Sequence, residues 1–338
     1  MAGNKIDGVF EGGGVKGIGL VGAVTVMEEK GFQFENVAGT SAGAIVASLI
    51  AAGYTAGDLK KIVQGMDYRK FQDKGWLDKI PGLGPALSLG FEKGIYEGKF
   101  FESWLRGLLA HAPKGKVTTF KDLVMDEYKD DPQFRYKLQV IAADITRGKM
   151  LILPRDIVDY GIEPDNLEVA LAVRMSMSIP FFYEPVILKD TSGTPCYIVD
   201  GGILSNFPVW LMDDHTANPP WPTFGFKLVG PTDGKPNTIN GPVTLFAALF
   251  QTMMEAHDNY HIEEAQFART IPIPTLGIGT TEFNLSKDKS NRLFKSGVGA
   301  AEKFLQGWDF EQYKQKYRQK RSAAPQKAVL PRKPGVPQ

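Results

Sequence analysis

The sequence predicts an α/β fold in which helices cover a mostly parallel central sheet, and three observations lead to this prediction. Short apolar runs that fit strands alternate with helix-like segments from the N-terminus onward. The chain has 338 residues, which is enough for a sizeable core. Its composition, 43% hydrophobic and 23% charged, is ordinary for a folded protein and excludes general disorder.

The first elements surround the glycine-rich segments of the chain. Strands are predicted at residues 6–10 and at Val37 and Ala38, each followed by a glycine turn and then by a helix, at about 18–30 and 42–52. Thr55 and Asp58 form a capping box that opens the next helix.

The rest of the chain continues the α/β pattern. Predicted strands lie at 137–143, 151–153, 197–199, 223–228 and 270–273, and predicted helices lie at 99–110, 166–175, 243–265 and 287–306. No compositional break separates these elements, so we expect one domain over residues 1–310. Residues 311–338 are expected to form a flexible tail, because residues 314–338 hold eight Lys or Arg, four prolines and no acidic residue.

Residues 76–110 are expected to form a lid or interface segment beside a pocket. Glycine and proline interrupt residues 76–98, while the Trp, Ile, Leu and Phe side chains there need an apolar neighbour. Core packing is the simpler interpretation of the helix that follows, and contact with acyl chains or a membrane is the functional alternative. Its apolar stripe at helical spacing is formed by Phe101, Trp104, Leu105, Leu108 and Leu109.

Charge, cysteine content and hydropathy restrict the partners and the location. There are 39 basic and 38 acidic side chains, so no overall field attracts nucleic acid, and no nucleic-acid partner is expected. The single cysteine, Cys196, excludes internal disulfides. No secretory signal is recognisable, and the longest apolar run, residues 42–54, is shorter than the ~20 residues of a membrane span. We expect a cytoplasmic protein with peripheral membrane contact, or one delivered by a specialised secretion route.

The segment GGGVKG, Gly12–Gly17, fits two kinds of anion site. It lies between a strand and a helix, as the dinucleotide-binding pattern G-x-G-x-x-G does. That pattern needs an acid about twenty residues on, and Glu35 lies near this spacing, but we expect it to flank a turn rather than to end a strand. Adjacent backbone N–H groups equally suit the oxyanion of an acyl transfer. The loop by itself leaves both interpretations open.

The segment GTSAG, Gly39–Gly43, matches the nucleophile elbow G-x-S-x-G between a strand and a helix. The flanking glycines allow the backbone to turn sharply. Ser41 would then sit in a strained conformation at the helix N-terminus, where free N–H groups and the helix dipole favour developing negative charge. Ser41 is therefore the candidate nucleophile.

A serine nucleophile needs a base, and the four histidines are poor candidates. None of them follows a predicted strand; His257 and His261 have the spacing of zinc ligands on a helix but lack the glutamate of the zinc protease motif. Asp200, followed by Gly201 and Gly202, ends a predicted strand at the edge where α/β sheets place ligands. Asp200 is the second candidate, with an ordinary turn as the alternative.

Taken together and in this order, GGGVKG at 12–17, GTSAG at 39–43 and DGG at 200–202 resemble the patatin-like phospholipase family. RMSMSIPFFYEP at 174–185 and LSNFP at 204–208 add to the likeness, which covers about residues 5–308. The resemblance implies a three-layer α/β/α fold and calcium-independent hydrolysis of acyl esters in phospholipids or lysophospholipids at a transient membrane surface, with no cofactor. Glu11 departs from the pattern, because many members have aspartate before the glycines.

The same resemblance implies roles for single residues. Ser41 would be the nucleophile of a Ser-Asp dyad and Asp200 its base. Gly12, Gly13 and Gly14 would form the oxyanion hole, with the amides of Gly13 and Gly14 as donors. Supporting positions would be Lys16, Gly17, Gly39, Gly43, Gly201 and Gly202, with Lys16 able to steer a lipid phosphate.

Two other functions remain open from the sequence. A nucleotide- or dinucleotide-binding protein would use residues 12–17 and would leave Ser41 and Asp200 without a role. A catalytically silent lipid-binding module would keep the fold without an activated serine.

Overall fold

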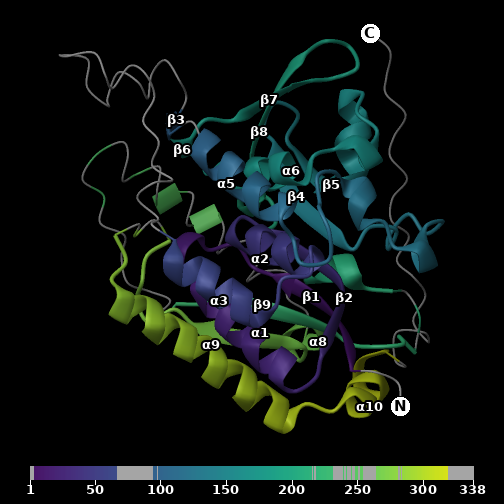
Figure 1. Ribbon diagram of the computed structural model, residues 1–338, viewed down its shortest axis with the longest axis vertical. Coiled ribbons are helices and arrows are strands. Elements are labelled where there is room, and N and C mark those ends of the chain that lie inside the picture. The colour runs from purple at the N-terminus through teal and green to yellow at the C-terminus, as the bar shows by residue number, and fades with distance from the viewer. Residues whose placement is uncertain are drawn as a thin grey trace.

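The computed structural model describes residues 4–66, 94–96, 98–214, 216, 218–230, 264–280, 282 and 284–318, together with a few positions between 239 and 253. Within these residues a mixed sheet of eight strands forms the centre of the protein (Figure 1). Its order is β10–β9–β1–β2–β4–β8–β7, and β5 also pairs with β4.

The sheet has a parallel half and an antiparallel half. The parallel strands are β1 (Lys5–Phe10), β2 (Gln33–Thr40), β4 (Leu138–Asp144), β9 (Thr223–Val229) and β10 (Thr270–Pro274). The strands with only antiparallel pairs are β5 (Lys149–Leu153), β7 (Val186–Lys189) and β8 (Pro195–Asp200). A separate two-stranded sheet pairs β3 (Gly94–Tyr96) with β6 (Phe181–Tyr183).

Helices flank this sheet. The described helices are α1 (Ile18–Glu29), α2 (Ala42–Ala51), α3 (Ala56–Gly65), α5 (Lys99–Ala110), α6 (Val169–Ser176), α8 (Glu264–Phe267), α9 (Lys287–Gly307) and α10 (Phe310–Tyr313). The apolar sides of α1, α2, α6 and α9 share one core cluster with one face of the sheet. A 3₁₀ turn, Val209–Met212, packs against Val9 and Ala38 on the other face. The predicted three-layer α/β/α fold is therefore confirmed.

Alternation along β1 shows why both faces are apolar. Ile6 and Phe10 point into the larger cluster, and Val9 points into the cluster on the opposite face. A parallel strand that is covered on both faces of the sheet needs apolar side chains on both faces, and β1 has them.

Most predicted elements lie within a few residues of their predicted bounds, and the capping box of α3 is present between Thr55 and Asp58. The prediction that Glu35 flanks a turn is wrong, because β2 begins at Gln33 and contains this residue, but Glu35 does not end the strand, as predicted. The predicted helix at 243–265 lies mostly outside the described residues. The short strands β3, β6 and β7 were not predicted, since three or four residues carry little periodic signal.

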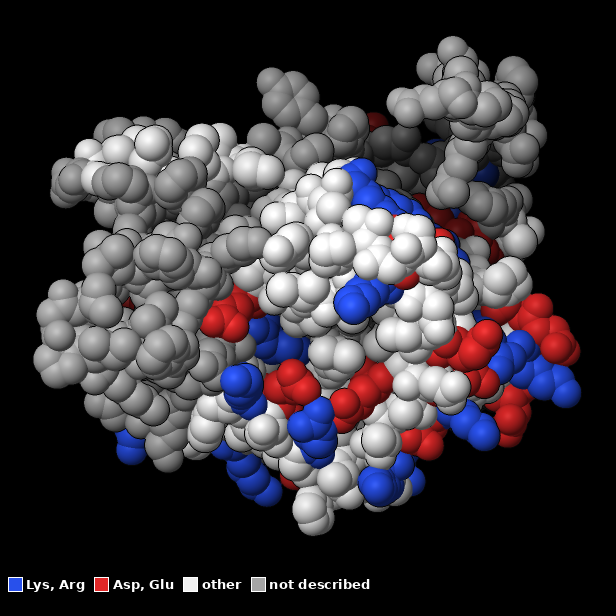
Figure 2. Space-filling view, turned by 90° about the horizontal axis from the view of Figure 1, so that it is seen from above, with Lys and Arg blue, Asp and Glu red and all other residues white. Residues whose placement is uncertain are grey.

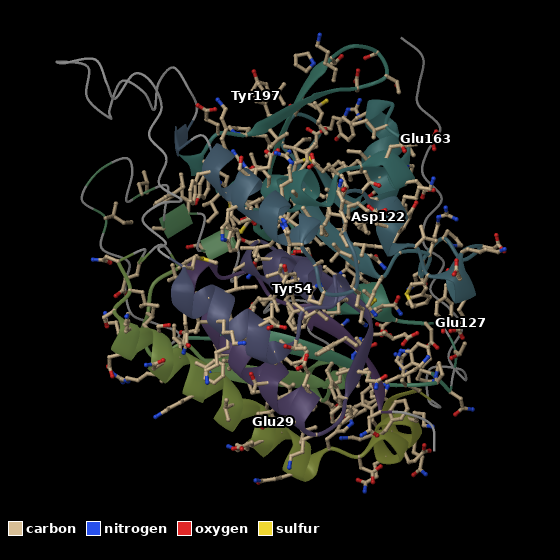
Figure 3. The ribbon with its side chains drawn as sticks, in the orientation of Figure 1. Glu29, Tyr54, Asp122, Glu127, Glu163 and Tyr197 are labelled. Atoms are coloured by element: carbon tan, nitrogen blue, oxygen red, sulfur yellow. The ribbon has the colours of Figure 1, made fainter. Side chains whose placement is uncertain are left out.

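The apolar stripe of α5 packs into the core. Phe101, Leu105 and Leu109 are buried, and the Tyr54 hydroxyl donates to the Leu108 carbonyl at 2.8 Å, which ties the turn after α2 to α5 (Tyr54 is labelled in Figure 3). Core packing therefore describes Phe101, Leu105 and Leu109, while Trp104 and Leu108 are only partly buried, and contact of this helix with acyl chains or a membrane stays a prediction. Residues 67–93 and 97, which include the rest of the predicted lid, lie outside the described residues.

The folded part of the chain extends beyond the predicted domain end at residue 310. After α10 the chain forms one further helical turn, Lys314–Arg318. Arg318 is buried; its Nη2 lies 3.0 Å from Asp213 Oδ1, and its Nη1 donates to the Asp214 carbonyl at 2.9 Å. The expected flexible tail cannot begin at 311, because these ion pairs and hydrogen bonds fix the chain through Arg318. Residues 319–338 lie outside the described part.

The described surface carries mixed charge. Basic and acidic side chains are interspersed on the face seen in Figure 2. Among the described helices, none is both long enough and apolar enough to cross a bilayer.

Candidate active site

Ser41 occupies a sharp turn between β2 and α2. It is the N-cap residue of α2, with φ 53° and ψ −124°, and the residue as a whole is nearly inaccessible at 2% exposure. A positive φ is a strained conformation for serine and persists only where the surroundings enforce it. The turn is tight, because a Cβ at Gly39 would collide with the backbone of Gly43, and a Cβ at Gly43 would collide with the carbonyl of Phe10.

The pairing of β4 explains how residues so distant in the chain meet. Along one edge, β4 pairs with β5 over Val140–Asp144. Along the other edge it pairs first with parallel β2, whose Thr40 lies opposite Ile141, and then with antiparallel β8, whose Asp200 lies opposite Ala142. The carboxyl ends of β2 and β8 therefore point at each other on one edge of β4.

This arrangement corrects one prediction from the sequence. Asp200 does not end a parallel strand, because β8 is antiparallel to β4. It nevertheless reaches the carboxyl edge of the parallel half, since β8 enters from the opposite direction and stops where β2 stops.

Asp200 is completely buried. Burial raises the pKa of its carboxyl to about 7, while the Gly202 N–H, which donates to Oδ1 at 2.8 Å, and the nearby Ser41 hydroxyl lower it. The other oxygen, Oδ2, has no hydrogen-bond partner among the described residues. Near neutral pH this carboxyl can therefore both accept and donate a proton, and one of its oxygens is unengaged.

Three consecutive residues at the end of α6 contact Ser41 and Asp200. The Ser176 hydroxyl accepts the Ser41 backbone N–H at 2.8 Å, and the Met177 sulfur accepts the Ser41 hydroxyl at 3.6 Å. The Ser178 carbonyl accepts the Asp200 N–H at 2.9 Å. One short segment thus holds both candidate residues.

The glycine loop lies against Ser41, at the carboxyl end of β1. A Cβ at Gly12 would lie 3.1 Å from the Ser41 Cβ. The Gly12 N–H donates to the Asn206 carbonyl at 3.2 Å, and the Asn206 side-chain amide donates back to the Gly12 carbonyl at the same distance. The Gly12 N–H is therefore engaged, which argues against Gly12 as an oxyanion donor and leaves it a role in shaping the loop.

Gly13 and Gly14 differ from Gly12. Their N–H groups donate to no other group among the described residues. Gly14 has φ +56°, and a Cβ there would collide with the carbonyl of Thr280, which accepts the next N–H of the loop, that of Val15, at 3.2 Å. Contacts on both sides thus fix the conformation of this loop, which lies against Ser41 at Gly12.

The remaining predicted positions surround this centre. A Cβ at Gly17 would lie 3.2 Å from the Ala42 Cβ, so the loop packs closely on the start of α2. The Lys16 N–H donates to the Gly13 carbonyl at 3.2 Å. Gly201 packs on the Ile141 carbonyl so closely that a Cβ would collide with it. Glu11 is buried, and its carboxylate accepts the Leu228 N–H, which joins β1 to β9.

Residues 8–213 match the patatin-like phospholipase family. The chain belongs to this family. It is 40% identical to the uncharacterized protein YqhO of Bacillus subtilis over 90% of its own length and 99% of that protein. A probable lipid hydrolase, 463L of Invertebrate iridescent virus 6, is 25% identical over 60% of this chain and 61% of the viral protein.

A solved structure shares the patatin-like fold. The crystal structure of VipD from Legionella pneumophila aligns with 90% of this chain and 67% of that chain, at a TM-score of 0.55 and 19% sequence identity. Membership of the patatin-like phospholipase family supports lipid ester hydrolysis as the class of reaction.

The dinucleotide-binding interpretation requires an acidic residue that can bind the ribose, and Glu35 is not in the position for this. In that pattern the acid lies at the carboxyl end of the second strand, near the glycine loop. Glu35 lies near the opposite, N-terminal end of β2, where its carboxylate pairs with Lys5 at 3.2 Å. Glu35 therefore cannot bind the ribose of a dinucleotide held at the glycine loop of this patatin-like chain.

Histidines and metal ligands do not complete the site within the described residues. His111 lies on the surface at the end of α5, where its Nδ1 is 2.9 Å from the Gly107 carbonyl. His215, His257 and His261 lie outside the described residues. In the described part of the chain no group of three or more His, Cys, Asp or Glu could hold a metal ion.

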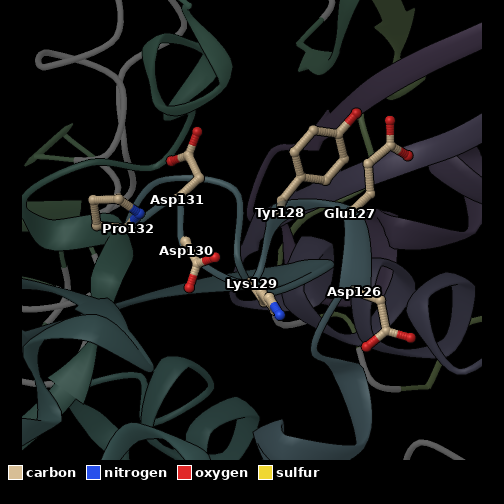
Figure 4. A pocket seen from close by; sticks show the side chains of 7 residues that line it. All are labelled: Asp126, Glu127, Tyr128, Lys129, Asp130, Asp131 and Pro132. Carbon is tan, nitrogen blue, oxygen red and sulfur yellow. The ribbon is translucent and has the colours of Figure 1, made fainter.

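A cavity of about 540 Å³ contains neither Ser41 nor Asp200 in its lining (Figure 4 shows the residues that line it). Its lining consists of seven consecutive residues, Asp126–Pro132, which precede β4 and so lie towards the edge opposite Ser41. A pocket formed by one stretch of loop lacks the converging groups of a catalytic site.

Sequence reasoning missed the contribution of Ser176, Met177 and Asn206. These residues lie in the 174–185 and 204–208 segments, which entered the prediction only as part of a resemblance. Neither spacing nor residue type marks them, because their contacts with Ser41 and Gly12 arise only from the tertiary fold.

Proposed function

We propose that this protein is a lipid acyl hydrolase of the phospholipase A or lysophospholipase type, with Ser41 as the nucleophile and Asp200 as the general base. The observation that carries the proposal is the meeting of β2 and β8 on β4, which brings a strained serine beside a buried carboxyl of raised pKa. Perturbed titratable groups beside a candidate nucleophile are typical of catalytic sites.

In the first half-reaction, Asp200 Oδ2 takes the proton of the Ser41 hydroxyl as Oγ attacks the ester carbonyl carbon. The bond to the leaving alcohol then breaks, and Asp200 returns the proton to the alcohol oxygen. A carboxyl of ordinary pKa, ~4, is a weak base for an alcohol, so the raised pKa of Asp200 favours this transfer.

In the second half-reaction, Asp200 removes a proton from water, and the hydroxide attacks the acyl carbon bound to Ser41 Oγ. The Ser41–acyl bond breaks, the fatty acid leaves, and the proton returns to Ser41. One residue thus acts as base and then as acid in each half, which requires a pKa near the working pH.

The amides of Gly13 and Gly14 would stabilise the negative oxygen of both tetrahedral intermediates. Their N–H groups have no partner within the described residues, and the loop conformation is fixed by Asn206 and Thr280. Donors fixed in advance cost little reorganisation during the reaction, and one such donor is typically worth about 3–4 kcal/mol.

Calcium independence, reaction at a transient membrane surface and a cytoplasmic location complete the proposal. The chemistry above assigns every proton transfer to Asp200 and every charge stabilisation to backbone amides, so it needs no metal. Membership of a phospholipase family supports phospholipid or lysophospholipid substrates.

The decisive experiment is labelling by a fluorophosphonate together with hydrolysis of short-chain p-nitrophenyl esters. The unmodified protein should be labelled at Ser41, and Ser41→Ala and Asp200→Asn should each lose turnover by at least about 10³-fold while remaining folded. Normal turnover by either folded variant would eliminate the dyad. Mass spectrometry of the products from defined phospholipids and lysophospholipids then identifies the substrate type and acyl position.

A further inference from the structure

The Ser176 hydroxyl stands where a hydrogen bond of the sheet would otherwise be. In the β2–β4 ladder the Val37 N–H donates to the Lys137 carbonyl. In a parallel pair, successive bonds of this kind are two residues apart on both strands. Two steps beyond the Val37–Lys137 bond, the Ser41 N–H would therefore donate to the Ile141 carbonyl. The chain turns away at Ser41, and these two groups do not bond directly.

Instead, the Ser176 hydroxyl lies between them. It accepts the Ser41 N–H at 2.8 Å and donates to the Ile141 carbonyl at 2.6 Å. Ser176 is completely buried, so no bulk water competes for either bond. One side chain therefore satisfies two backbone groups that the turn would otherwise leave unpaired in the core.

The bridge also reaches the other half of the site. The Ile141 carbonyl lies against Gly201, the residue that follows Asp200. The next residue of β4, Ala142, lies opposite Asp200. Ser176 therefore fixes the backbone of Ser41 to the point on β4 that also fixes the position of Asp200.

We propose that Ser176 is a positioning residue that sets the distance and orientation of Ser41 relative to Asp200. This inference rests on the proposed function of the two residues. The Ser176 hydroxyl bonds the Ser41 N–H and the Ile141 carbonyl rather than Oγ or the Asp200 carboxyl, so it acts through the backbone of a serine held at positive φ. Removing the bridge lets the turn relax, and small displacements of a nucleophile can reduce rates by as much as about 10²-fold.

The test compares Ser176→Ala and Ser176→Cys with Ser48→Ala. Ser48 is a matched control, because it is equally buried and its hydroxyl bonds only the Ile45 carbonyl, at 2.8 Å within α2. We expect Ser176→Ala to lower kcat for a p-nitrophenyl ester by about 10- to 100-fold with KM changed less than about twofold. The Cys variant, whose thiol bonds more weakly, should fall between alanine and serine.

Hydrogen exchange gives a second readout that does not depend on activity. Peptides covering residues 38–44 should exchange faster in Ser176→Ala, and those covering α1 should not change. Wild-type kcat in folded Ser176→Ala, or a loss of the same size in Ser48→Ala, would overturn the inference. If alanine prevents folding, the kcat of Ser176→Cys decides, with a wild-type value counting against the bridge.

The two proposals fail in distinguishable ways. Retained turnover in Ser41→Ala refutes the proposed function. Retained turnover in Ser176→Ala, combined with its loss in Ser41→Ala, refutes only the positioning role.

Discussion

Ser41 and Asp200 follow one another in space along a single edge of β4: Ser41 comes directly after β2, Asp200 ends β8, and these two strands run in opposite directions. Thr40 and Asp200 lie opposite the consecutive residues Ile141 and Ala142. The separation of these two strand ends is therefore set by backbone hydrogen bonds of the central sheet. A rigid support of this kind suits a reaction that depends on the position of a proton acceptor.

The pH dependence of turnover should report the ionisation of Asp200. Only its carboxylate form can take the proton of Ser41, and burial raises its pKa to about 7. We expect kcat/KM for a neutral ester to rise about tenfold per pH unit below pH 7 and to level off above it. A profile that is flat from pH 5 to pH 8 in the unmodified enzyme would contradict Asp200 as the base.

The stability of the fold should also depend on the ionisation of Asp200, but it should favour the protonated carboxyl, whereas turnover needs the carboxylate. Between about pH 4 and 7 the native carboxyl keeps a proton that the unfolded chain has lost, so the free energy of unfolding falls as the pH rises. Asp200→Asn removes the contribution of this carboxyl to the slope, so the stability of the variant relative to wild type should increase by up to about 1.4 kcal/mol per pH unit across this window. Above pH 7 the difference should stay constant.

Urea unfolding of both proteins at several pH values measures this difference. Asp7, another buried carboxyl whose pKa burial raises, to about 6, is present in both proteins and cancels in the comparison. A variant that is less stable than wild type at pH 8 would argue against a buried, weakly solvated Asp200.

Gly14→Ala should lower kcat strongly while the protein remains folded. The new Cβ would collide with the Thr280 carbonyl and displace the loop that carries two unengaged amides. Loss of one oxyanion donor corresponds to about 10²–10³-fold in kcat. Ester kinetics and thermal unfolding of the same preparation measure the two effects.

Gly148→Ala is the matched control for the backbone conformation. Gly148 has φ +60°, close to the +56° of Gly14, but no atom lies within 4 Å of the position of its Cβ. Both variants share the cost of a positive φ, and only Gly14→Ala should lose turnover. Equal losses in the two variants would show that backbone strain, rather than the loop, is responsible.

Chelation should leave the rate unchanged. The proposed chemistry uses a carboxyl and backbone amides, and the described residues contain no cluster of three or more metal-ligating side chains. Initial rates measured with EDTA, and again with added calcium, test this expectation. A loss of activity that calcium restores would count against the mechanism.

The sequence predicted the local parts of the site because each has a local cause. The glycines of GTSAG are required by close backbone contacts around the turn, and the capping box of α3 lies within four residues of sequence. The direction of β8 and the engagement of the Gly12 N–H could not be predicted, since each depends on a partner far away in the chain.

By itself, the sequence determined the α/β pattern, the sharp turn at Ser41 and the aspartate that ends a strand, because periodicity, glycine and capping act over a few residues. Only the tertiary structure decided that β8 meets β2 end to end on β4. It also decided that the Ser176 hydroxyl joins the Ser41 N–H to the Ile141 carbonyl of β4. The physical reason is that hydrogen-bond pairing between strands, and burial of a carboxyl, are set by neighbours that the order of residues along the chain does not specify.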